Sequence, residues 1–144
     1  TEDTDVVLLK FDNGSLGTLS VSDTIISPWS WELTSNENSI YPNQKQNCYW
    51  IGGTHGSMEL PQSKIWKSTE KRSWGEPLTY TNNKVDETKN HPLNEQLDNF
   101  LAVIEKKHEA VCSGLDGLNT LAVIEAIKLA AKKGAAVKPE ILKD

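Results

Sequence analysis

A helix that is apolar on nearly every side most restricts how this chain can fold. The pattern predicts that it follows Ser113, with Asp116 in a capping-box position, and ends at residues 132–134, where two lysines precede a glycine. Its polar stripe is narrow, comprising Glu125, Lys128 and Lys132. The apolar positions surround the axis: Leu118, Leu121, Ala122, Val123, Ile124, Ala126, Ile127, Leu129, Ala130 and Ala131. Such a helix is normally buried nearly all round, so we expect a sheet on one side and a second helix or a missing domain on the rest.

The preceding part of the chain predicts short β-strands. Asn13-Gly14 lies between two β-rich runs, which is a strong hairpin signal. A glycine-rich turn at residues 53–56 joins two further strands. The predicted strands cover residues 6–11, 16–21, 48–51, 57–60, 64–68 and 77–80. Residues 81–90 are polar, and we expect them to be mobile.

A first long helix is predicted after this polar segment. One helical face carries Leu93, Leu97, Phe100, Leu101 and Ile104. Asn90 is the expected N-cap, with Pro92 in the first turn. Val137 is expected to begin a final edge strand. Together these elements predict one α/β (α+β) domain over residues 1–144, with an open, mostly antiparallel sheet of about six strands and two main helices on one face.

Charge and composition exclude several classes of protein. The net charge of −5 disfavours a nucleic-acid or anionic-membrane surface, and no apolar run approaches the ~20 residues of a membrane span. Cys48 and Cys112 stand far apart and are interpreted as two separate thiols, without metal-site spacing. The chain begins with neither Met nor a signal peptide and enters a strand-like run almost at once, so we expect a piece of a longer protein, and its missing targeting signals say nothing about that protein. We expect a cytoplasmic location for the longer protein.

No catalytic, cofactor or metal site is predicted within the chain. Residues 53–56 lie between strands, and residues 114–117 lack the GxGxxG spacing, so both favour turns or caps over a nucleotide site. His55 and His108 are expected at the surface. His91 is a capping-region histidine or a ligand-binding residue, because it lies at a helix start beside a polar loop.

An aromatic segment gives the strongest functional signal. Residues 27–50 place five large rings among Ser, Asn, Gln, Glu and Pro, without helical or strand periodicity. Trp29, Trp31 and Tyr41 either pin a long loop to the domain or stack on a sugar or polyol, whose hydroxyls would bind Glu32, Glu37 and Asn38. The predicted substrate-binding residues are Trp29, Trp31, Glu32, Tyr41 and His91.

Four segments resemble a known family in their order and spacing. They are DVVLLKFDNGSLGTLSVS, IGGTHGSMELP, HPLNEQLDNFLAVIE and SGLDGLNTLAVIEAIKLAAKKGAAV. In this order they resemble the C-terminal domain of the glucose–fructose oxidoreductase, inositol dehydrogenase and MocA family. The family's Rossmann domain, cofactor fingerprint, Lys-Pro motif and catalytic Asp-to-His pair have no counterpart here. The resemblance therefore implies no catalytic residue in this chain, and an isolated chain that binds no cofactor and does not turn over.

The resemblance implies a substrate-binding and oligomerisation domain of an NAD- or NADP-dependent oxidoreductase acting on a sugar or polyol. Its expected partners are its own N-terminal Rossmann domain, a sugar-like small molecule and a second copy bound through the open sheet face. Strand patterning also favours the second copy, because residues 6–9 and 48–51 do not alternate and both their faces require cover. Two alternatives are a nicotinamide-dependent glycoside hydrolase and a free-standing sugar-binding or dimerisation module.

Overall fold

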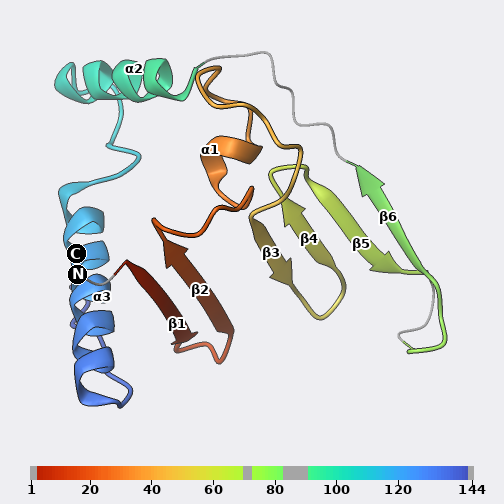
Figure 1. Ribbon diagram of the computed structural model, residues 1–144. Helices are drawn as coiled ribbons and strands as arrows, with labels where there is room; N and C mark the ends of the chain where they lie inside the picture. The colour runs from red at the N-terminus through yellow and green to blue at the C-terminus, as the bar shows by residue number, and fades with distance from the viewer. Residues whose placement is uncertain (1–2, 70–72, 83–90, 143–144) are drawn as a thin grey trace. The chain divides into compact units, whose positions relative to one another are not determined.

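Six antiparallel strands, three helices and their connections make up a computed structural model that describes residues 3–69, 73–82 and 91–142 (Figure 1). The strands form two sheets, one of two strands and one of four in the order β3-β4-β5-β6. The elements are β1 (Thr4–Lys10), β2 (Leu16–Ser22), α1 (Trp31–Thr34), β3 (Tyr49–Gly52), β4 (Ser57–Leu60), β5 (Lys64–Ser68), β6 (Leu78–Asn82), α2 (Pro92–Ile104) and α3 (Gly114–Lys133).

The β1–β2 hairpin forms where its turn signal predicts it. The strands pair in a regular register from Thr4 opposite Ser22 to Lys10 opposite Leu16. Gly14 has a φ of 86°, which a residue with a Cβ rarely adopts, and the Asn13 Oδ1 accepts the Ser15 N–H at 3.0 Å. The local chemistry of the turn therefore determines the register of the whole hairpin.

The four-stranded sheet is a meander built from three consecutive hairpins. Gly52 pairs with Ser57, and the Gly53 N–H donates to the Gly56 carbonyl at 2.8 Å, which closes the turn predicted at residues 53–56. Strand β5 then pairs with β4 and with β6, so β3 and β6 are the edges. Because neighbouring strands pair in register, side chains from β3 to β6 lie on common faces of the sheet.

The predicted mixed α/β class and the antiparallel pairing of six strands are confirmed. The arrangement differs in one respect, since the strands form two sheets where one was expected. Two compact units account for this division: residues 1–25 with 97–144, and residues 26–96. The first unit contains β1, β2 and α3, and the second contains α1 and the four-stranded sheet.

Helix α3 begins and ends where the sequence predicts. The Ser113 Oγ accepts the Asp116 N–H at 3.2 Å, and the Asp116 carboxylate accepts the Ser113 N–H at 2.7 Å, which completes the capping box. At the other end Gly134 adopts the left-handed conformation at φ 62°. Both signals are local, so they operate whatever packs against the helix.

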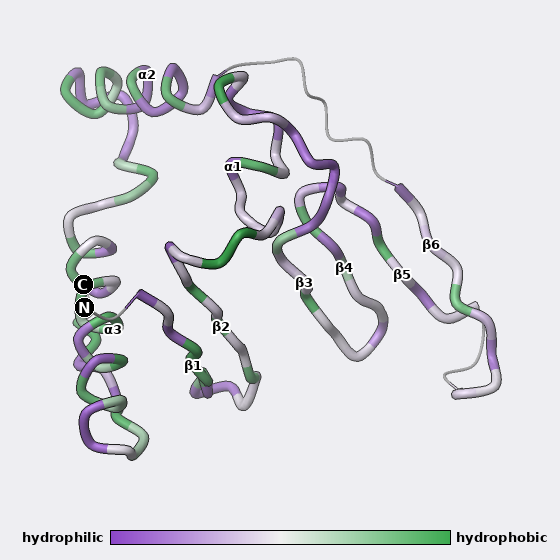
Figure 2. Tube along the Cα trace, viewed as in Figure 1, coloured by the Kyte–Doolittle hydropathy of each residue, from purple (hydrophilic) through white to green (hydrophobic). Residues whose placement is uncertain are grey.

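Burial of α3 differs from the prediction. Only Ala126 is buried among its described residues, and Leu118 and Leu121 are 48% and 57% exposed. Hydrophobic residues recur along β1, β2, α2 and α3 (Figure 2), and several of those on β1 and β2 are exposed as well. The expected cover of α3 therefore does not come from the described part of its own unit.

Several smaller predictions are corrected. Thr81 and Asn82 continue strand β6, and the rest of the predicted mobile segment, residues 83–90 with Asn90, lies outside the described residues. Val137 begins no strand. Instead the Asn119 side chain donates to the Leu142 carbonyl at 3.0 Å and accepts its N–H at 2.9 Å, which holds the C-terminal segment against α3. The backbone of Leu142 thus bonds to the side-chain amide of Asn119 instead of to a neighbouring strand.

The α3 capping box should make folding stability depend on acid pH. Hydrogen bonds from the Ser113 side chain and backbone lower the pKa of Asp116 from its ordinary value of 3.8. This stabilisation is complete above the unfolded-state pKa and is lost as the pH falls through the lower folded-state pKa. We expect Asp116→Asn to flatten the fall in melting temperature between about pH 5 and pH 2, measured by far-UV circular dichroism. An unchanged pH profile would contradict this role, with Asp98→Asn as the control.

Candidate functional site

The aromatic segment folds around the short helix α1. The Ser30 Oγ caps this helix by accepting the Leu33 N–H at 3.3 Å. Thr34 is 1% exposed, and its hydroxyl donates to the Ser30 carbonyl at 2.7 Å. The Gln44 N–H then donates to the Leu33 carbonyl at 2.7 Å, which ties the returning chain to the helix. The segment is thus an ordered loop with its own hydrogen bonds.

Trp31 holds this loop in place. Its Nε1–H donates to a Glu37 carboxylate oxygen at 2.7 Å, and its ring lies 5.8 Å from that of Tyr49 on β3, tilted by 47°. Asn38 is also used internally, because its Oδ1 accepts the Ile40 N–H at 3.0 Å. Of the two interpretations of the segment, anchoring therefore describes the contacts of Trp31, Glu37 and Asn38.

Trp29, Glu32 and Tyr41 remain exposed around this anchored centre. The residues Trp29 and Tyr41 are 62% and 43% exposed, and Glu32 lies in the first turn of α1. Their aromatic faces and carboxylate are accessible to a ligand, which is the arrangement that the binding interpretation requires.

His91 lies at the start of α2 and is exposed. Its Nδ1 accepts the Leu93 N–H at 3.3 Å, and its carbonyl accepts the Asn94 N–H at 2.8 Å, so it occupies the N-cap position directly before Pro92. Among the described residues no contact joins His91 to Trp29, Trp31 or Tyr41. All five predicted site residues thus belong to the second unit. The four residues of the loop are also near one another in sequence, whereas His91 is not.

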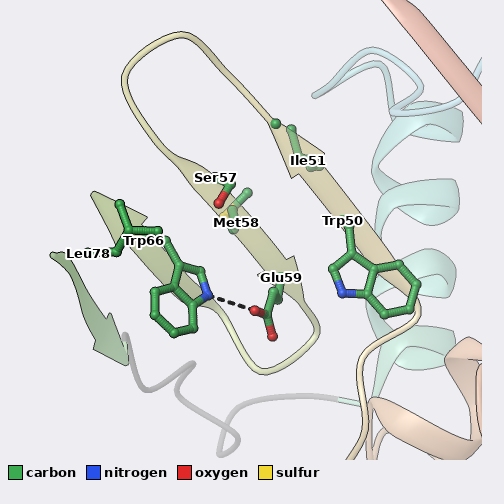
Figure 3. Close-up of a pocket in the computed structure, with 8 residues that line it drawn as sticks. Trp50, Ile51, Ser57, Met58, Glu59, Trp66 and Leu78 are labelled. Atoms are coloured by element: carbon green, nitrogen blue, oxygen red, sulfur yellow. Dashed lines mark hydrogen bonds between the residues drawn. The ribbon is translucent and has the colours of Figure 1, made fainter. Parts of the chain in front are cut away.

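A second group of aromatic residues lies on one face of the four-stranded sheet, and the sequence reasoning missed it. An open pocket of about 400 Å³ lies over strands β3 to β6 (Figure 3). Trp50 pairs with Glu59, and Ser57 pairs with Trp66, so these four side chains share one face. Tyr80 joins them because it pairs with Trp66.

Hydrogen bonds fix the Glu59 carboxylate between the two indoles. One oxygen accepts the Trp66 Nε1–H at 2.7 Å, and the other accepts the Asn47 Nδ2–H at 2.8 Å. Figure 3 shows the first of these bonds, with Trp50 on the other side of Glu59. The carboxylate is thus held in one orientation without a formal ion pair.

Lys64 completes the electrostatics of this face. Its Nζ lies 4.2 Å from the Trp66 ring centroid and 4.3 Å from that of Tyr80, which are cation–π distances. The two rings themselves lie 4.9 Å apart, tilted by 48°. Because Lys64 also pairs with Glu59 across the strands, the described strand residues of this face carry one positive and one negative charge.

The signal for this face was present in the two hairpins. Once the turn at residues 53–56 sets Gly52 opposite Ser57, the period-2 alternation places Trp50 opposite Glu59. The next turn adds Trp66 to the same side. The strand register that the turn imposes therefore predicts that Trp50, Glu59 and Trp66 share a face.

The cysteines and the two other histidines also carry reactive side chains. Both cysteines are free thiols, as predicted. Among the described residues, no group of His, Cys, Asp or Glu is arranged to hold a metal ion. His55 and His108 are exposed, as expected. No helix in the part of the chain that the structure describes is long and apolar enough to cross a membrane.

Comparison with known proteins supplies the family. Comparison with curated proteins and with solved structures gives no match. A family model described as the C-terminal alpha/beta domain of an oxidoreductase family, that of the Gfo/Idh/MocA proteins, matches residues 1–138. This match covers nearly the whole chain of 144 residues and agrees with the mixed α/β elements. The chain therefore belongs to the Gfo/Idh/MocA oxidoreductase family, as its C-terminal domain.

Proposed function

We propose that this chain is the substrate-binding and oligomerisation domain of an NAD- or NADP-dependent oxidoreductase that acts on a sugar or polyol in the cytoplasm. Family membership implies an N-terminal partner domain, and we assign the nicotinamide cofactor to that domain, as a Rossmann fold. The observation that carries the substrate class is the exposure of two aromatic residues, Trp29 and Tyr41, and of Glu32 in one ordered loop. Aromatic faces stack on sugar C–H groups, while carboxylates accept hydrogen bonds from hydroxyls.

Within this site we give the residues different roles. Trp29, Glu32 and Tyr41 contact substrate, because they are exposed. Trp31 positions the loop through Glu37 and Tyr49. His91 is proposed to face the substrate from the start of α2.

Kinetics of the full-length parent test this assignment. Trp31→Ala and His91→Ala should each raise KM or lower kcat by about tenfold, the first because the loop loses its anchor and the second because a contact with substrate is lost. Cofactor affinity should stay unchanged, because no residue of this chain is assigned to the cofactor. The matched control is Trp74→Ala, since Trp74 is fully exposed outside the loop. Wild-type kinetics in both variants would leave these residues as loop anchors only.

Two other functions share these residues. A nicotinamide-dependent glycoside hydrolase would cleave a glycoside where the oxidoreductase only oxidises or reduces it, so product analysis separates the two. A free-standing sugar-binding or dimerisation module would lack a GxGxxG strand–turn–helix and a Lys-Pro motif in the coding sequence before Thr1. Finding both motifs there would support the enzymes.

The same proposal includes a second copy of the chain. Val6, Leu8 and Leu16 share one face of the two-stranded sheet and are 76%, 82% and 78% exposed. Opposite them in the register lie small hydroxyl residues and Lys10. An apolar row of this kind usually marks an interface, and a symmetric dimer is the commonest way to cover it.

A further inference from the structure

On the aromatic face of the four-stranded sheet, two small residues, Gly52 and Ser57, lie between larger side chains. Gly52, Ser57 and Trp66 are consecutive partners across three strands, and Trp50 and Glu59 form the adjacent row. Cross-strand neighbours lie about 5 Å apart and residues i and i+2 about 7 Å apart. Gly52 and Ser57 therefore leave space about one six-membered ring wide. The side chains of Trp50, Glu59 and Trp66 stand around Ser57 in Figure 3.

Gly52 is required for this space but not for the backbone. A Cβ built on Gly52 meets no atom within 4 Å, and its φ is not in the left-handed region. By the strand alternation this Cβ would point to the same face as Trp50 and Ser57. A larger residue at position 52 would thus occupy the space between Trp50 and Ser57 without a clash in the ligand-free protein.

The charges favour a neutral ligand with hydroxyl groups. Glu59 and Lys64 carry opposite charges on this face, and Lys64 already occupies the cation–π position over Trp66 and Tyr80. Each Glu59 oxygen uses one lone pair on a protein N–H, so each can accept one further hydroxyl. No hydrogen bond or ring contact joins Trp50 to another described residue, so its 64% exposed indole offers a stacking surface.

We propose that this pocket is a second carbohydrate site, which takes one neutral pyranose ring and is separate from the loop site around Trp29. The C–H face of the sugar stacks on Trp50. Two neighbouring hydroxyls donate to the Glu59 carboxylate, and a third exchanges a hydrogen bond with the Ser57 hydroxyl. Trp66 closes the far side, and Asn47 keeps the carboxylate in the orientation that accepts both hydroxyls.

Side-chain NMR of the chain tests this site directly. Methyl β-glucopyranoside, titrated to high millimolar concentration, should shift the indole Nε1–H signals of Trp50 and Trp66. The Trp74 signal should stay in place, because Trp74 is fully exposed outside the pocket. The cation probe tetramethylammonium should leave Trp50 unmoved. Shifts with tetramethylammonium but not with the glucoside would overturn the choice of a neutral sugar.

Paired variants connect the shifts to the pocket. Trp50→Ala and Gly52→Val should each weaken glucoside binding at least tenfold, while the matched Gly75→Val should have no effect, since Gly75 lies in open loop space. Trp50 is largely exposed, so its variant tests the site even if Gly52→Val folds poorly. Unchanged affinity in Trp50→Ala would overturn the proposal.

The loop site gives a separate result in the same spectra. Shifts confined to Trp29 would overturn the second site and would support the proposed substrate loop. Shifts at Trp50 and Trp66 with Trp29 unmoved would support the second site whatever the function of the loop.

Discussion

Replacing Leu8 by glutamate is expected to dissociate the proposed dimer, with a rise in its Kd on the order of 1,000-fold. Leu8 is 82% exposed in the chain and lies in the apolar row with Val6 and Leu16. A symmetric interface contains the substitution twice, and an unpaired polar group costs about 2 kcal/mol for each copy that buries it. The net charge of −5 on each chain adds repulsion to the new carboxylates.

Sedimentation equilibrium at micromolar concentration measures this effect. The unmutated chain should sediment as a dimer, and the Leu8→Glu variant as a 16.0 kDa monomer. Leu8→Val controls for the loss of shape, and Gln46→Glu controls for the added charge at an exposed loop position. If the unmutated chain is a monomer, the dimer is rejected. Another domain would then have to bury Val6, Leu8 and Leu16.

Gly56→Ala is expected to destabilise the four-stranded sheet by about 2 to 3 kcal/mol. A Cβ on Gly56 would lie 2.5 Å from the Trp66 carbonyl oxygen, closer than such atoms can approach. Because that oxygen belongs to the backbone of β5, relief requires β4 and β5 to separate. The same movement would displace Trp66 from Glu59.

Urea unfolding followed by circular dichroism measures this loss. Gly52→Ala is the matched control, since its Cβ meets nothing within 4 Å and the substitution also restricts the unfolded chain. The control should be neutral or slightly stabilising. Equal stability of the two variants would show that the strands adjust to the Gly56 methyl group, contrary to the expectation.

The sequence by itself determined the elements with local causes. Asn13-Gly14 sets the first hairpin, because its left-handed turn needs no distant partner. Ser113 and Asp116 begin α3, and Gly134 ends it, since these groups bond only to backbone within one turn. The family was also readable from the order of such segments, and the family model confirms it.

Tertiary structure alone decided what depends on register and cover. Trp50, Glu59 and Trp66 meet because two hairpin turns align three strands, and one slipped residue would send their side chains to opposite faces. Trp31 became an anchor because Glu37 and Tyr49 lie within reach once α1 forms. Periodicity showed that α3 is apolar on nearly every side, but hydrophobicity has no direction and does not name a partner, so only the structure shows that its own unit leaves it exposed.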